Sequence, residues 1–236
     1  MLNLSEKHVM IQKIAEKIAK DKVSPRAKEI DATGAFPWDL VDIYKKYGFL
    51  YLMLPERFGG LDGDITSLCL VIEEIAKVSG APSLIPLSHN VGLMPIVIAA
   101  NDEQKEYIYS KITEPDKLHL VAFALTEPDG GSDASHMRTQ VTKDGDYYYL
   151  NGKKSMITNG ANAQFFTIFA STNSALRTKG ISAFYVEKDY PGVTIGKSED
   201  KMGMRGSDLT EIIFDNVRLT QSNLLGKEGD GWDIAM

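Results

Sequence analysis

The hydrophobic pattern of the chain changes its period near residue 118, and this change constrains the fold more than any other feature. Before it, apolar residues recur at helical spacing, as Ile11, Ile14 and Ile18 do. After it come short β-rich runs separated by Gly, Asn, Asp and Pro, at 147–150, 165–170, 181–186 and 211–214. The sequence therefore predicts an α+β, multidomain chain, with an all-α N-terminal helical domain followed by a β-barrel or β-sandwich middle domain.

The length of 236 residues is enough for two domains that each bury a core. We expect a helical domain over 1–117 and a β domain over 118–228. Residues 229–236, which include Trp232, look like the start of a further helix that is cut off.

The charge and composition of the chain indicate which kinds of partner and which cellular compartment to expect. Hydrophobic residues make up 43% and charged residues 25%, as in soluble globular proteins, and the net charge of -6 argues against a nucleic-acid-binding protein. Cys69 is the only cysteine, so no disulfide can form within the chain. The N-terminus is charged rather than apolar, which predicts no signal peptide and a cytoplasmic location.

The most apolar long segment of the chain covers 84–100. Pro86, His89, Asn90 and Pro95 interrupt it. The interruptions predict a buried pair of helices rather than a membrane span, so no membrane contact is expected.

Four residues with oxygen-bearing side chains nearly match the spacing of a calcium loop: Asp62, Asp64, Thr66 and Glu73. The sixth position of such a loop requires glycine, and here it is Ser67. Helical periodicity also runs through the segment without a break. We therefore expect a helix start here, and no metal site in the chain.

The segment 118–133 is an apolar run that ends in a glycine turn. The run over 118–125 predicts a buried strand that presents Thr126 at its rim. Gly130 and Gly131 permit positive φ and remove Cβ atoms, so main-chain N–H groups and the Ser132 hydroxyl can approach an acceptor-rich ligand. An ordinary glycine turn is the alternative.

Asp144-Gly145 and Asn151-Gly152 are both strong hairpin signals. Together they predict a three-stranded meander that returns Met156-Ile157-Thr158 to the side of Thr126. A flat heteroaromatic ligand with donors and acceptors on its edge could bind at the shared rim.

The stretch Ala124-Leu125-Thr126-Glu127-Pro128-Asp129-Gly130-Gly131-Ser132-Asp133 resembles the flavin-loop signature of the acyl-CoA dehydrogenases. Further stretches resemble that family in order and approximate spacing, at 54–60, 154–160, 201–207 and 226–232. His136 departs from the pattern, where a small residue is usual, and so does Met156, where an aromatic residue is common.

The resemblance implies an FAD-dependent acyl-CoA dehydrogenase, which removes the α-proton and the β-hydride of an acyl-CoA thioester. Such enzymes act in fatty acid metabolism and β-oxidation. The flavin contacts implied are Phe123, Leu125, Thr126, Gly131, Ser132, Met156, Ile157 and Thr158. Ser132 would also touch the CoA moiety, and Leu84 and Leu87 would line the acyl pocket, where a plain core role is the alternative.

In that family the catalytic glutamate lies in a C-terminal helical domain, of which 229–236 would be the truncated start. We therefore assign no catalytic residue in this chain, and a structural role is expected for Glu127. The resemblance also implies an electron-transferring flavoprotein as electron acceptor and a homotetramer.

Two other function classes stay open. The first is a non-catalytic two-domain module that binds flavin or a CoA thioester without turnover. The second is a related flavin oxidase or monooxygenase of the same fold, in which oxygen reaches the reduced flavin.

Overall fold

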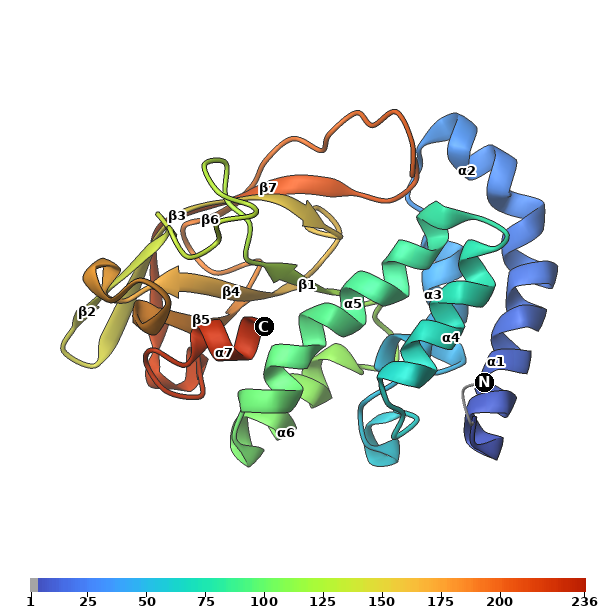
Figure 1. Ribbon diagram of the computed structural model, residues 1–236, viewed down its shortest axis with the longest axis horizontal. Coiled ribbons are helices and arrows are strands. Elements are labelled where there is room, and N and C mark those ends of the chain that lie inside the picture. The colour runs from blue at the N-terminus through green and yellow to red at the C-terminus, as the bar shows by residue number, and fades with distance from the viewer. Residues whose placement is uncertain (1–3) are drawn as a thin grey trace. The chain divides into compact units, whose positions relative to one another are not determined.

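The computed structural model describes residues 4–236 and divides the chain into two compact units (Figure 1). The first unit comprises residues up to Asn90 together with Asp200–Ser207. The second comprises Val91–Glu199 and Asp208–Met236. The boundaries of these units differ from those of the domains expected over 1–117, 118–228 and 229–236. Those domain boundaries stay a prediction.

The first unit is helical. Amphipathic segments with apolar residues at helical spacing bury one face each, and α1 packs along α4 (Figure 1). The α-helices that begin in this unit are α1 (Glu6–Ile18), α2 (Ala27–Thr33), α3 (Trp38–Lys46), α4 (Ile65–Ala76) and α5 (Gly80–Ala99). A π-helical turn over Ala19–Val23 and a 3-10 turn over Ser24–Arg26 join α1 to α2, and further 3-10 turns cover Phe49–Tyr51 and Glu56–Phe58.

The pair of helices predicted over 84–100 is wrong, because α5 is one continuous helix of 20 residues. The Asn90 side chain donates hydrogen bonds of 2.8 Å to the carbonyl oxygens of Pro86 and Phe49. The bond to Phe49 anchors the helix to a neighbouring segment of the same unit. By length and composition α5 could cross a membrane, but 61% of its most apolar window is buried inside the protein.

A short segment from the C-terminal half of the sequence completes the first unit. Arg205 donates to the carbonyl oxygen of Ala32 at 3.5 Å. Gly206 has a φ of 87°, and a Cβ atom there would lie 2.2 Å from Cγ2 of Ile30. Residues 200–207 therefore pack closely against α2 and the residues that follow it, which explains why glycine is needed at 206.

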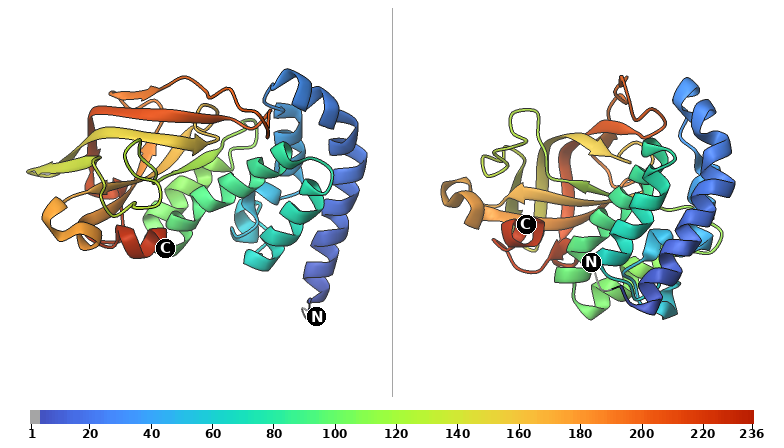
Figure 2. Two further views of the ribbon diagram at one scale, coloured as in Figure 1. Left: turned by 45° about the horizontal axis from the view of Figure 1, so that its top comes forward. Right: turned by 45° about the vertical axis from the view of Figure 1, so that its right-hand side comes forward.

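The second unit contains α6 (Asp102–Ile112), the strands and α7 (Gly231–Ala235) (Figure 2). The strands are β1 (Val121–Ala124), β2 (Gln140–Asp144), β3 (Tyr147–Thr158), β4 (Phe165–Ser171), β5 (Ile181–Glu187), β6 (Val193–Ile195), β7 (Leu209–Thr220) and β8 (Leu224–Leu225). They form an 8-stranded sheet in the order β6-β7-β3-β2-β4-β5-β8, with β1 pairing parallel to β4. The predicted succession of a helical part and a sheet-rich part is confirmed.

The predicted meander is wrong at its second turn. Asp144-Gly145 does form a hairpin, because Asp144 pairs with Tyr147 across β2 and β3. Asn151-Gly152 instead lies inside β3, at a register shift in the pairing with β7. Gly152 has a φ of 142°, and a Cβ atom would lie 2.6 Å from Cα of Thr139. The glycine therefore permits a β-bulge and a close backbone approach rather than a turn.

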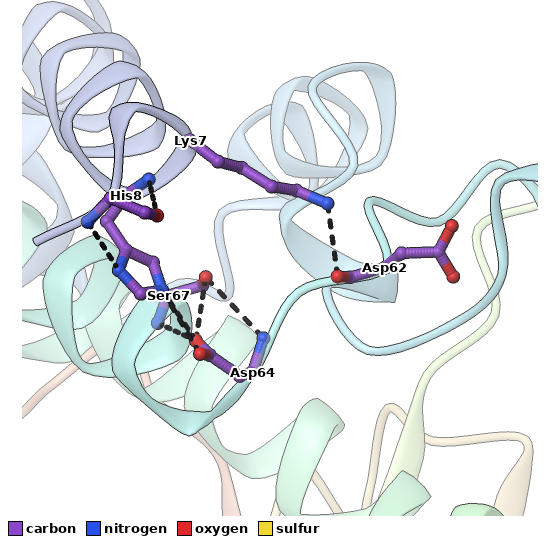
Figure 3. A network of polar contacts seen from close by, with 6 residues as sticks. Lys7, His8, Asp62, Asp64 and Ser67 are labelled. Atoms are coloured by element: carbon purple, nitrogen blue, oxygen red, sulfur yellow. Dashed lines mark hydrogen bonds and ion pairs between the residues drawn. The ribbon is translucent and has the colours of Figure 1, made fainter.

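The start of α4 is tied to the start of α1 by a polar network (Figure 3). Asp64 caps α4 by accepting the Ser67 N–H at 2.8 Å, which places these acids at a helix start as expected. His8 accepts the Ser5 N–H through Nδ1 at 3.3 Å and reaches the Asp64 carboxylate through Nε2 at 3.0 Å. The Ser67 N–H bond is the main reason why the pKa of Asp64 lies below its usual value.

Replacing His8 by alanine removes the link between two helix N-termini. We expect His8→Ala to lower the free energy of unfolding by about 1 kcal/mol, the usual effect of losing one capping contact. Lys13→Ala, at an exposed site on the same helix, is the control and should have almost no effect. Urea unfolding of both variants measures the difference, and equal stability of the two would contradict this role of His8.

Candidate functional site

The ends of two strands meet at one rim in the second unit. The N–H of Ser155 in β3 donates to the carbonyl oxygen of Thr126, just beyond the end of β1, at 2.9 Å. The Lys154 amine donates to the carbonyl oxygen of Leu125 at 3.0 Å. The structure thus brings the glycine loop that follows β1 and the 156–158 end of β3 together, as the sequence predicted.

The residues expected to contact a flavin differ in exposure along this rim. Thr126 and Thr158 are half-buried, Gly131 and Ser132 are exposed, and Ile157 is buried. The side chain of Ile157 therefore belongs to the core and leaves only its backbone for a ligand. Phe123 and Leu125 are half-buried too, and the Phe123 ring lies 4.9 Å from that of Phe169.

Met156 is the most exposed residue of this end of β3, with 58% of its surface accessible. Its φ is 58°, in the left-handed region, where the register between β3 and β7 shifts from Lys154 to Ile157. A non-glycine residue rarely adopts this conformation. The bulge interrupts the regular alternation of side chains along the strand at Met156, and the Met156 side chain is exposed at the rim.

The glycine loop is closed by a tight turn. Glu127 and Gly130 exchange backbone hydrogen bonds of 3.2 Å in both directions. Neither Gly130 nor Gly131 has a positive φ, so that reason for glycine at these positions is wrong. A Cβ atom on Gly130 would lie 2.9 Å from the carbonyl oxygen of Asp133, whereas one on Gly131 would meet nothing closer than Cγ2 of Thr126 at 3.7 Å. Close backbone approach is thus what Gly130 provides.

Asp208 holds the segment that follows Thr158, a role that sequence reasoning missed. Its carboxylate accepts the N–H groups of Ala161 at 2.7 Å and Asn162 at 3.1 Å. Its own carbonyl oxygen accepts the N–H of Asn159 at 3.2 Å. Burial raises the pKa of Asp208, although these bonds oppose the shift. No local pattern pointed to this residue, because its partners lie more than 40 positions away.

A buried ion pair lies beneath the rim, and sequence reasoning missed its cation. The Lys154 amine is 2.7 Å from Oε1 of Glu127, and both side chains are buried. Burial lowers the pKa of Lys154 to about 8, although Glu127 opposes this shift. Burial alone would raise the pKa of Glu127, but the charge of Lys154 and the hydrogen bonds to the carboxylate bring it below its usual value.

His136, which departs from the family signature, lies on the exposed side of the glycine loop. Its Nδ1 atom is 2.5 Å from Oδ2 of Asp133. A cavity of about 350 Å³ lies next to it, and its lining includes Ser135, Arg138 and Arg177. Two guanidinium groups therefore line this cavity, together with Asp129, which pairs with Arg138 at 2.7 Å.

The two residues expected in the acyl pocket lie in the first unit. Leu84 and Leu87 lie in α5 within the first unit, where both are half-buried, and their role in an acyl pocket stays a prediction. Among residues 4–236, no three His, Cys, Asp or Glu side chains are grouped so that they could hold a metal ion.

The two glycines of the loop offer a matched pair of substitutions. We expect Gly130→Ala to destabilise the protein by about 1–3 kcal/mol, because its methyl group must displace the backbone at Asp133. Gly131→Ala should leave stability unchanged or raise it by up to about 1 kcal/mol, because the unfolded chain loses freedom. Thermal unfolding measures both variants, and equal losses would contradict the close approach at Gly130.

The buried carboxylate of Glu127 makes stability depend on pH. Because its pKa is lowered in the folded state, it stabilises the fold above its usual pKa of 4.5 and loses that contribution as the pH falls further. We expect Glu127→Gln to cost about 3 kcal/mol at neutral pH, since it breaks a buried pair. That cost should shrink on acidification below the usual carboxyl pKa.

Urea unfolding from neutral pH to acid measures this cost. Glu211→Gln is the control, because Glu211 forms a half-exposed pair with Lys153 at 2.6 Å and should change stability little at any pH. A cost for Glu127→Gln that grows as the pH falls would contradict the assignment.

Sequence models of two domains match the chain: "Acyl-CoA dehydrogenase, N-terminal domain" over residues 5–116, and "Acyl-CoA dehydrogenase, middle domain" over residues 122–217. An acyl-CoA dehydrogenase of Bacillus subtilis (strain 168) is 42% identical over 236 residues, which are 100% of this chain and 62% of that relative.

Solved structures agree with these matches. Butyryl-CoA dehydrogenase from Megasphaera elsdenii has a TM-score of 0.91 and 35% identity, over 99% of this chain and 62% of that one. The FAD complex of PigA has a TM-score of 0.90 and 31% identity, over 99% of this chain and 61% of that one. The chain thus spans roughly three fifths of the length of these relatives. It belongs to the acyl-CoA dehydrogenase family and carries the N-terminal and middle domains of that family.

Proposed function

We propose that this chain forms the flavin- and thioester-binding part of an FAD-dependent acyl-CoA dehydrogenase. The reaction removes the α-proton of an acyl-CoA thioester to a base and its β-hydride to FAD, and gives the trans-2-enoyl-CoA. The observation that carries the proposal is the 2.9 Å hydrogen bond from Ser155 to Thr126, which joins the glycine loop and the end of β3 in one rim. Family membership supports it.

The rim suits a flat ring with donors and acceptors on its edge. Thr126 and Thr158 offer hydroxyl groups, and the bulge at Met156 leaves backbone groups beside them. Bound FAD would supply the hydride acceptor that protein side chains lack. The part of this chain is to bind and orient the ring, and the buried Ile157 and the half-buried Phe123 keep water from that side.

The exposed side of the glycine loop suits the phosphate groups of CoA. Arg138 and Arg177 line the cavity beside it, and a guanidinium group binds phosphate oxygens in a bidentate manner. Arg138 pairs with Asp129 at 2.7 Å, so a phosphate there would compete with that carboxylate. Ser132 follows the glycines of the same loop and would contact both cofactor and thioester. We assign Leu84 and Leu87 to the acyl end of the substrate, as part of the same proposal.

The catalytic base is proposed to lie outside this chain. Glu127 does not serve, because its carboxylate is 6% exposed and paired with Lys154. The base is expected in the C-terminal domain, which the family carries and these residues do not cover. We further propose that the electron acceptor is an electron-transferring flavoprotein and that the complete protein is a homotetramer. It would act in β-oxidation and be located in the cytoplasm.

Absorbance spectroscopy of the complete gene product tests this function. We expect a flavin band that bleaches under anaerobic conditions when butyryl-CoA or octanoyl-CoA is added, because the β-hydride reduces the cofactor. Free CoA is the control and should not bleach the band. Rapid recovery of colour in air with formation of hydrogen peroxide would indicate an oxidase, and a flavin band without bleaching would indicate a binding module. Either result contradicts the proposed reaction.

A further inference from the structure

The buried pair of Glu127 and Lys154 is placed where it can control the shape of the rim. Lys154 has no exposed surface and Glu127 has 6%. The adjacent residue in β3, Lys153, instead reaches Glu211 on β7 at 2.6 Å, in a pair that is partly open to solvent. Successive lysines of one strand thus differ sharply in environment, because side chains alternate between the two faces.

The carboxylate of Glu127 holds both ends of the glycine loop. Glu127 lies at the start of the loop, and its side chain accepts the backbone N–H groups of Arg138 at 2.7 Å and Thr139 at 3.0 Å, where the loop ends. Gly131 and Ser132 lie between these two ends. The path of the loop is therefore closed by one side chain rather than by the strands alone.

The amine of Lys154 joins this closed loop to the strand that carries Met156. It donates to Glu127 at 2.7 Å and to the carbonyl oxygen of Leu125 at 3.0 Å. The next residue, Ser155, makes the 2.9 Å backbone bond to Thr126. One buried group thus connects the residues before the loop, the loop itself and the end of β3.

Stability alone does not account for an ion pair at this place. Removing two charges from water is costly, and well-packed apolar side chains of similar volume often stabilise a protein as much or more. Apolar side chains cannot, however, bind backbone groups at fixed distances and directions. What the pair supplies is therefore geometry, at the segments whose backbone would face the flavin.

We propose that Glu127 and Lys154 are positioning residues that hold the 125–139 loop and the 156–158 end of β3 in the conformation that binds FAD. This inference rests on the proposed function. Neither side chain would touch the cofactor, because both are buried beneath the rim. They act through the backbone of Leu125, Arg138 and Thr139.

The test compares Lys154→Met with Lys153→Met, which makes the same change on the opposite face of the strand. FAD is removed from the complete gene product, and the Kd for added FAD is measured by fluorescence titration. We expect Lys154→Met to weaken FAD binding by about tenfold or more, which corresponds to about 1.4 kcal/mol. Lys153→Met should bind FAD within about twofold of the unsubstituted protein.

A double variant separates positioning from stability. Glu127→Gln with Lys154→Met leaves no unpaired buried charge, so it should be more stable towards urea than Lys154→Met alone. If the pair serves geometry, its FAD affinity stays low although stability recovers. Hydrogen exchange of the flavin-free protein should also be faster over 125–139 in both variants, and unchanged in Lys153→Met.

The outcomes are distinct. FAD affinity that recovers together with stability in the double variant would overturn the positioning role and leave a purely structural pair. Unchanged affinity in Lys154→Met would overturn it as well. If the unsubstituted protein binds no FAD, the proposed function itself fails, and that result is visible without any variant.

Discussion

The second unit depends on β3 being one continuous strand with a partner on each side. β2 pairs with it over Tyr147 to Asn151, and β7 pairs with it as far as Thr158. Because both of its edges are hydrogen-bonded, β3 cannot shift its register without breaking two ladders. The places of Lys154 and Met156 are therefore set by the sheet, and the glycine loop is fixed to the sheet through them.

Much of this arrangement could be predicted from the sequence, because it depends on local periodicity. The change of period near residue 118 is of this kind. The approach of Thr126 to the end of β3 was expected too, but from a meander whose second turn does not form. The hairpin at Asn151-Gly152 was mispredicted because the dipeptide signal is local, whereas the ladder with β7 joins residues far apart in the chain. The pairing with β7 outweighed the turn preference of the dipeptide, and Gly152 lies at a β-bulge instead of a turn.

Other features could not be predicted, because burial depends on partners distant in sequence. In the sequence Lys154 resembles any surface lysine. Its burial is made possible by two acceptors more than 25 positions away, the Glu127 carboxylate and the Leu125 carbonyl oxygen. The same holds for Asp208, whose acceptor role depends on Ala161 and Asn162. In α5 the prolines suggested a break, but the segment is one helix, which is largely buried and is anchored to Phe49 through Asn90.

The discontinuity of the first unit has a consequence for protein synthesis. Its helices are made early, but residues 200–207, which pack against α2, follow β1 to β6 in the chain and precede β7 and β8. The first unit therefore cannot be completed on the ribosome until β1 to β6 of the second unit have been translated. A fragment that ends at Asn90 would leave Ile30 without the backbone of Gly206 against it. The helical unit and the sheet-rich unit thus differ in sequence pattern, but the helical unit is completed only after part of the sheet has been synthesised.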